Sequence, residues 1–235
     1  MSGVNRIGDH AVRLAERYAG WWLREQHDTR AMQALQPLAR SYAPWNAYAM
    51  RPAGLLAVLN DIVANRRTHV VECGGGVSTL FIARLLAERG GRLQTIEDDR
   101  PWADALAQEL DREGLGGHAS VICAPLEPAP SAWPGEQGRW YRSSTLDEAV
   151  TEPIDVLVVD GPSAYTRPTR HARYPALPYF RRLLRPDCAV FLDDVSRRGE
   201  RDVLERWERE FNLRFERRYV RGRIAVARTG RSFVV

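Results

Sequence analysis

The sequence predicts an α/β fold: a Rossmann-like, doubly wound, mostly parallel sheet with a C-terminal antiparallel hairpin and an N-terminal helical extension. Two observations predict it. From Thr68 onward, short apolar segments alternate with stretches long enough for helices, which is typical of a parallel sheet covered on both faces. The first of these segments runs directly into three glycines and then a helix-like stretch, as expected where a strand ends above a ligand site.

The order of the elements follows from this alternation. Residues 1–50 are expected to form a helical extension or lid, and residues 51–235 one α/β domain. We predict strands over 69–73, 92–97, 119–123, 155–160 and 188–193, and helices over 78–89, 101–113, 174–185 and 198–211. The tail, 215–220 and 224–227 around Gly222, predicts the hairpin. The stretch 125–144 holds four prolines and predicts a long functional loop.

The turn after the first strand indicates the kind of ligand. Gly74–Gly76 leave room for a ligand beside the backbone amides and permit positive φ. A carboxylate at Glu72 would repel a pyrophosphate and attract the ammonium of an amino acid, which favours S-adenosylmethionine over a dinucleotide. The dinucleotide pattern G-x-G-x-x-G also fits poorly, because its third glycine is Thr79 here. The alternative is an ordinary strand-to-helix turn.

Acids follow the second strand. Glu97 is the first acid after its apolar residues, and an acid at this strand tip can accept both ribose hydroxyls of a nucleoside. Asp98 comes next, and Pro101 opens a helix where its missing N–H has no consequence. The alternative is a solvated acidic loop in which Asp99 caps that helix.

Three further acids end the fourth and fifth strands, namely Asp160, Asp193 and Asp194. The carboxyl ends of parallel strands converge on the ligand crevice of such a sheet. The three carboxylates would repel one another unless a cation lay between them, and oxygen ligands suit Mg²⁺ or a similar hard ion. In the alternative, Asp160 serves cofactor or substrate alone, and the other two cap the next helix.

From about Met50 to Ala227 the chain resembles the class I S-adenosylmethionine-dependent methyltransferases. Within them it is similar to the catechol O-methyltransferase-like, metal-dependent group and to bacterial enzymes that tailor antibiotics and sugars. The resemblance implies that residues 51–235 are the methyltransferase domain. It implies that the methionine end of the cofactor contacts Glu72, Gly74, Gly76, Ser78 and Thr79, and that the ribose contacts Glu97 and Asp98. It further implies adenine contacts at Pro125 and Leu126 and a cofactor contact at Asp160. A metal is implied at Asp160, Asp193 and Asp194.

The expected chemistry is in-line transfer of a methyl group from the sulfonium to a substrate oxygen, with the metal acidifying and aligning the hydroxyl. The catechol group has a lysine shortly after the fourth-strand acid, and this chain has no lysine. His171 is therefore the candidate general base beside Asp160, or else an ordinary surface histidine. Arg167, Arg170 and Arg173 could clamp an anionic group on the substrate, or form a solvated basic face.

Composition argues against nucleic-acid and membrane partners, whereas the resemblance implies that the partner is a small hydroxylated molecule, and the loop arginines add an anionic group as an option. The net charge of +4 is too small and too dispersed to indicate nucleic acid, and no apolar stretch approaches a membrane span. Three cysteines in no metal spacing fit a reducing cytoplasm. Trp21-Trp22 would be core or a homodimer contact. Two other functions stay open: a nicotinamide-dependent oxidoreductase and a non-catalytic nucleotide-binding protein.

Overall fold

A central sheet of seven strands organises the molecule in the computed structural model, which describes residues 4–40, 43, 45–129, 133–230 and 232–234, with side chains from Tyr18 onward. The sheet order is β3-β2-β1-β6-β7-β9-β8, parallel except for β9, which runs antiparallel to both neighbours. The strands are β1 His69–Cys73, β2 Arg92–Glu97, β3 Ala119–Cys123, β6 Ile154–Val159, β7 Leu184–Leu192, β8 Glu216–Arg218 and β9 Ile224–Arg228. This arrangement confirms the predicted fold class and its terminal hairpin.

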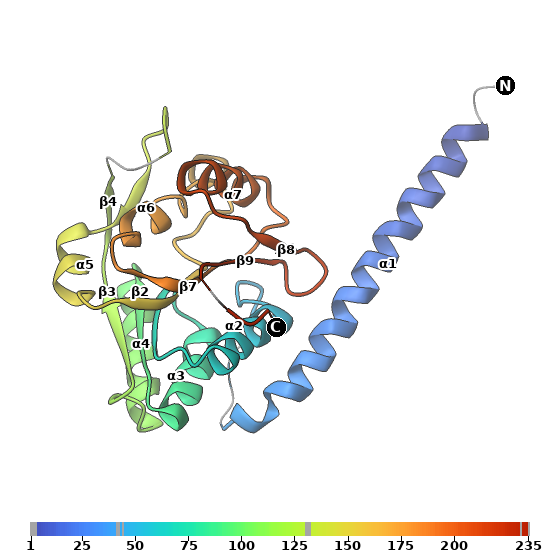
Figure 1. Cartoon of the computed structure of the whole chain (residues 1–235). Coiled ribbons are helices and arrows are strands. Elements are labelled where there is room, and N and C mark those ends of the chain that lie inside the picture. The colour runs from blue at the N-terminus through green and yellow to red at the C-terminus, as the bar shows by residue number, and fades with distance from the viewer. Residues whose placement is uncertain (1–3, 41–42, 44, 130–132, 231, 235) are drawn as a thin grey trace.

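Helices cover both faces of this sheet, and each face has its own apolar core. One core receives α2 Pro52–Ala64, α3 Val77–Arg89 and α4 Arg100–Arg112, and the other receives α5 Ser143–Ala149, α6 Ala176–Phe180 and α7 Arg198–Phe211. Figure 1 shows α6 and α7 on one side of the sheet and α2, α3 and α4 on the other.

The strands supply both cores because their side chains alternate with period two. On β6, Val156 and Val158 enter the core of α2 to α4, whereas Leu157 and Val159 enter the core of α5 to α7. All four are fully buried. A run of consecutive apolar residues, such as 156–159, is therefore what a sheet covered on both faces favours.

Two predicted boundaries are wrong. The helix expected over 174–185 is limited to α6, because the chain is already extended at Leu184, which pairs with Ile154 of β6. The loop expected over 125–144 contains a two-stranded antiparallel ribbon, β4 Leu126–Pro128 with β5 Arg139–Tyr141. Residues 130–132 of that stretch lie outside the described residues.

The N-terminal extension is one long helix, α1 Val4–Leu35, followed by the 3₁₀ turn Gln36–Leu38. Its C-terminal end packs on the domain, where Ala31 and Leu35 are buried, and the rest projects away from the sheet (Figure 1). Trp21 and Trp22 lie on the projecting part and are exposed. Among the described residues, none of the helices combines the length and apolarity needed to cross a membrane.

A buried ion-pair cluster ties α2 to the edge of the sheet. Asp61 is fully buried on α2, and its carboxylate accepts from Arg67 Nε at 3.3 Å and from Arg228 at the end of β9. Both guanidinium groups are themselves nearly buried. Removal of the carboxylate would leave two nearly buried cations with only longer ion pairs, from Arg67 to Asp187 at 4.0 Å and from Arg228 to Glu216 at 3.7 Å.

We therefore expect Asp61→Ala to lower the free energy of unfolding by about 3–5 kcal/mol, as for other broken buried pairs. Urea denaturation followed by circular dichroism measures it. The matched control is Glu88→Ala, which removes the exposed partner of Arg40 and should lower it by about 1 kcal/mol or less. Equal losses in the two variants would contradict the assignment of Asp61 as an anchor.

Candidate active site

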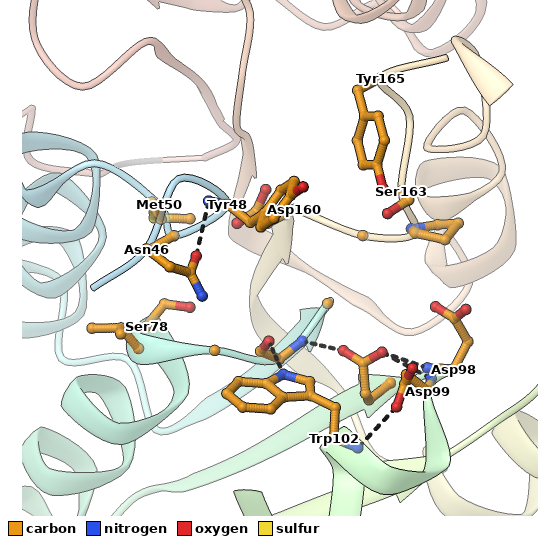
Figure 2. Close-up of a pocket in the computed structure, with 18 of the residues that line it drawn as sticks. Asn46, Tyr48, Met50, Ser78, Asp98, Asp99, Trp102, Asp160, Ser163 and Tyr165 are labelled. Atoms are coloured by element: carbon orange, nitrogen blue, oxygen red, sulfur yellow. Dashed lines mark hydrogen bonds between the residues drawn. The ribbon is translucent and has the colours of Figure 1, made fainter. Parts of the chain in front are cut away.

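A cavity of about 380 Å³ opens at the carboxyl ends of β1, β2 and β6 (Figure 2). Its floor is the glycine turn and the start of α3, one wall is the acidic tip of β2, and the opposite wall is the end of β6 with residues 160–163 and Tyr165. Residues 46 and 48–50, between α1 and α2, close it from the side. The volume falls within the range of sites for small molecules and cofactors.

The glycine turn needs its glycines for two different reasons. Gly74 has a φ of +86°, and a Cβ there would lie 2.7 Å from the backbone nitrogen of Gly161. Glycine is therefore required for the turn to pass β6. A Cβ at Gly76 would meet nothing within 4 Å. The backbone at Gly76 instead borders open space at the start of α3, where a ligand can approach the helix N-terminus.

The orientation expected for Glu72 is wrong. Its side chain is fully buried, does not line the cavity, and accepts three hydroxyl hydrogen bonds, from Ser78 Oγ at 2.5 Å, Thr79 Oγ1 at 2.6 Å and Thr95 Oγ1 at 2.8 Å. Burial raises the pKa of Glu72, whereas the three hydroxyls lower it. Glu72 therefore supports the turn from below and does not meet an ammonium group. Thr79 is likewise buried behind the turn, where Gly76 N donates to its hydroxyl at 3.0 Å.

Glu97 and Asp98 lie at the cavity, as predicted from the end of the second strand. Glu97 accepts from three backbone amides: Gly75 N at 2.9 Å, Asp98 N at 2.9 Å and Asp99 N at 3.0 Å. The carboxylate thus fixes the β2 tip against the glycine turn and retains lone pairs for a ligand. Asp99 caps α4 by accepting from Trp102 N at 2.9 Å.

Several cavity residues escaped the sequence analysis. Trp102 donates from Nε1 to Gly75 O at 2.8 Å and lies along the floor of the cavity (Figure 2). Tyr141, at the end of β5, is fully buried with its hydroxyl unpartnered beside the cavity. The Trp140-Tyr141 pair was visible in the sequence, but only the β4–β5 pairing shows which of the two rings reaches the site.

The residues expected around adenine are placed differently. Pro125 and Leu126 do not line the cavity. Leu126 begins β4 and borders a second, smaller cavity of about 210 Å³ with Trp133 and His171. The reason is the β4–β5 ribbon, which turns the chain after β3 away from the glycine turn and brings Tyr141 back in its place.

His171 is also placed away from the cavity at the glycine turn and borders the smaller one, which corrects its assignment as general base. It is 5% exposed, with Nδ1 3.0 Å from Glu136 Oε2 and Nε2 3.2 Å from Asp202 Oδ2. Its ring stacks on Trp133 with centroids 3.9 Å apart. Both ring nitrogens are therefore engaged by carboxylates, and His171 holds its loop between the ribbon and α7.

The structure does bring Asp160, Asp193 and Asp194 together, with carboxylate oxygens within 4.8 Å of one another. Burial raises the pKa of Asp160 to about 7 and that of Asp193 well above its usual range. The buried guanidinium of Arg173 lies among them, 3.0 Å from Asp160 Oδ1 and 3.3 Å from Asp194 Oδ2. The donor set alone would suit a hard cation, but with Arg173 in this position the residues do not fit one.

The fold and this site define a class, that of enzymes which bind a nucleoside-containing cofactor above a glycine turn. The sequence matches the family described as a methyltransferase domain over residues 71–195, which is more than half of the chain. The chain belongs to this family and is a methyltransferase. No curated protein matches it.

Solved structures share this fold. A putative caffeoyl-CoA O-methyltransferase from Staphylococcus aureus is 14% identical, has a TM-score of 0.59, and covers 91% of this chain and 100% of its own. The O-methyltransferase from Bacillus cereus in complex with S-adenosylhomocysteine is 16% identical, with a TM-score of 0.54 over 87% and 91%. The O-methyltransferase TomG from Streptomyces achromogenes, involved in tomaymycin synthesis and bound to S-adenosylmethionine, is 21% identical, with a TM-score of 0.51 over 87% and 90%. At these identities the similarity establishes the fold.

Substitutions of Glu72 and Glu97 should have different effects, the first on stability and the second on ligand binding. Glu72→Gln puts an amide among three hydroxyl donors, and we expect the free energy of unfolding to fall by about 1–3 kcal/mol. Glu97→Gln should chiefly weaken binding of S-adenosylhomocysteine. Urea denaturation and calorimetry on both variants measure the two effects. A Glu72→Gln protein of unchanged stability that had lost the ligand would restore the ammonium contact expected from the sequence.

The affinity for S-adenosylhomocysteine should also depend on pH through Asp98. Burial first, and then the charge of Glu97, raise the pKa of Asp98 to about 6. The carboxylate is ionised above that pH and is then the stronger acceptor, so affinity should fall as the pH drops from about 8 to about 5, by roughly fivefold for one charge-assisted hydrogen bond. Calorimetry in matched buffers measures this, and Asp98→Asn should flatten the profile. An Asp98→Asn protein with the parent's pH dependence would exclude Asp98 as its source.

Proposed function

We propose that this methyltransferase is an S-adenosylmethionine-dependent O-methyltransferase acting on a small hydroxylated molecule. The observation that carries the proposal is the cavity itself, in which bare glycine backbone at a helix N-terminus faces the acidic tip of β2. Cofactor and acceptor classes are supported further by the neighbours of the same fold that are described as O-methyltransferases, two of them bound to S-adenosylmethionine or its demethylated product.

The residues that line the cavity fit such a cofactor. The open space at Gly76 admits an amino-acid moiety beside Ser78, and Glu97 and Asp98 offer acceptors for ribose hydroxyls. The unpartnered hydroxyl of Tyr141 offers a buried donor on the side of the nucleoside. Burial raises the pKa of Tyr141 well above its usual range, so the donor keeps its proton at every physiological pH.

The acceptor would enter between the N-terminal segment and the loop after β6. Tyr48 and Tyr165 face each other there, with ring centroids 5.9 Å apart, and both are exposed. Ser163 and Asp160 lie below Tyr165 in Figure 2, at the boundary between the mouth and the cofactor cavity. An acceptor held by the two tyrosines would place its hydroxyl near Asp160, which supports the expectation that residues 1–50 include a lid.

The reaction is an in-line displacement, in which the bound cofactor supplies an electrophilic methyl group. The protein's share is to align the acceptor oxygen and to keep water out, and such alignment alone can account for several kcal/mol of the barrier, about 7–11 at most. Among the described residues, Asp160 is the one acid that borders both the cavity and the Arg173 cluster. We assign it the role of orienting the acceptor hydroxyl and receiving its proton.

Other expectations stay proposals. The metal is the exception: Mg²⁺ or a similar ion at Asp160, Asp193 and Asp194 would have to displace the guanidinium of Arg173, so the proposed reaction does not use one. Of the three loop arginines expected to clamp an anionic group, Arg170 pairs with Glu136 and Arg173 is buried, which leaves the exposed Arg167 as the candidate, although it borders a separate depression with Glu136 and not the main cavity.

We also propose a homodimer through the exposed aromatic face of α1, a cytoplasmic location in keeping with three free cysteines, and no nucleic-acid or membrane partner.

The cofactor assignment is tested by calorimetry with two ligands. S-adenosylhomocysteine should bind with micromolar or better affinity, and NAD should not bind, because a pyrophosphate would face the carboxylates of Glu97 and Asp98. Trp102→Ala should weaken the binding of S-adenosylhomocysteine by about 1–3 kcal/mol, since it removes both a cavity wall and the hydrogen bond that fixes Gly75.

Binding of NAD without binding of S-adenosylhomocysteine would reject the proposal in favour of an oxidoreductase. A screen of small hydroxylated acceptors then identifies the substrate.

A further inference from the structure

Two of the three strand-end carboxylates, those of Asp160 and Asp194, already pair with a buried cation of the chain. Arg173 is 4% exposed, and its guanidinium reaches groups on every side. Nη2 donates to Asp160 Oδ1 at 3.0 Å, and Nη1 donates to Asp194 Oδ2 and to Asp193 O, each at 3.3 Å. Nε donates to Pro162 O at 3.4 Å. All three nitrogens are thus used inside the cluster that a divalent ion would need.

A fourth carboxylate and a second guanidinium complete the cluster from α7. Glu200 Oε1 lies 3.7 Å from Arg173 Nη1 and is 1% exposed. Arg197 Nη2 lies 2.7 Å from Asp194 Oδ2, at the rim of the cluster. Two guanidinium groups therefore face four carboxylates, and Arg173 is the one of the two that lies at the centre of the cluster.

The loop that carries Arg173 is held in place by contacts with α7. A Cβ at Gly199, in the first turn of α7, would overlap the carbonyl oxygen of Arg170, so the loop lies directly on that helix. His171 is held by Asp202 of α7, and Tyr174 O accepts from Trp207 Nε1 at 2.9 Å. Contacts on both sides of Arg173 therefore fix the backbone that carries it.

We propose that Arg173 is the resident cation of this site, standing where a divalent ion would bind, so that the protein works without a metal. Arg173 is then a positioning residue, which holds one oxygen of Asp160 and leaves the other toward the cofactor cavity. The inference deepens the proposed function, but its test measures metal binding and does not depend on turnover.

The test titrates Mn²⁺ into metal-free protein and follows the free ion by electron paramagnetic resonance. The wild type should take up no stoichiometric Mn²⁺. Arg173→Ala should gain one site, with affinity higher by about tenfold or more because three carboxylates lose their counter-charge. Arg173→Ala combined with Asp193→Asn should lose it again. Arg197→Ala is the matched control, since it removes the same charge from the rim without vacating the centre, and it should gain no site.

Three results would overturn the proposal. In the first, the wild type binds one Mn²⁺ tightly and Asp193→Asn abolishes that binding. In the second, Arg173→Ala is folded but gains no Mn²⁺ site. In the third, Arg197→Ala gains an Mn²⁺ site of the same affinity as Arg173→Ala. If Arg173→Ala unfolds, Mn²⁺ should restore its circular dichroism spectrum but not that of the double variant, and failure to do so counts against the proposal. If S-adenosylhomocysteine does not bind while the Mn²⁺ pattern holds, only the proposed function fails.

Discussion

One buried carboxylate, that of Glu72, holds the three segments on which the cofactor cavity is built. It lies on β1 and accepts from two hydroxyls in the first turn of α3 and one on β2. A carboxylate without water is tolerated only where its lone pairs are satisfied, and here three hydroxyls satisfy them. The position of the glycine turn above the sheet follows from these bonds, and the open side of the turn is left free for a ligand.

A second set of contacts governs the opposite wall. The loop between β6 and α6 is fixed to α7 by His171, Tyr174 and the close approach at Gly199. The effect is to bring a guanidinium into the acids that end β6 and β7. The two walls therefore differ in kind: at β2 a carboxylate is stabilised by hydrogen bonds from backbone amides, and at β6 and β7 the carboxylates of Asp160 and Asp194 form ion pairs with arginine.

The sequence was sufficient for the sheet and for the positions of the acids. Five strands fall within a few residues of their predicted bounds, because a strand buried on both faces is mostly apolar and is bounded by turn residues. Asp160, Asp193 and Asp194 come together as predicted, because the carboxyl ends of parallel strands share one edge. These conclusions rest on periodicity and topology, which are local properties of the chain.

What the sequence could not supply is the direction of individual side chains. Whether Glu72 faces the ligand or the core depends on Thr95, a residue on the neighbouring strand. Whether His171 or Arg173 reaches the site depends on how the loop lies on α7. The two residues are only two positions apart, so a small difference in the path of the loop decides whether a candidate base or a cation faces the acids. Both ambiguities concern charged groups near the cavity, where the partner is distant in sequence.

A buried arginine explains how this chain can keep three acids at the strand ends, in an arrangement that would otherwise suit a metal ion. A guanidinium stays protonated when it is buried, because its pKa lies far above neutrality, and its planar donors can bridge two carboxylates at once. Burial works against this charge, but four neighbouring acids raise the pKa of Arg173 further. An arginine delivered by a rigid loop can therefore supply permanently the charge that a metal ion would supply reversibly. The consequence is an Asp160 whose orientation is set by the fold and does not vary with the supply of metal.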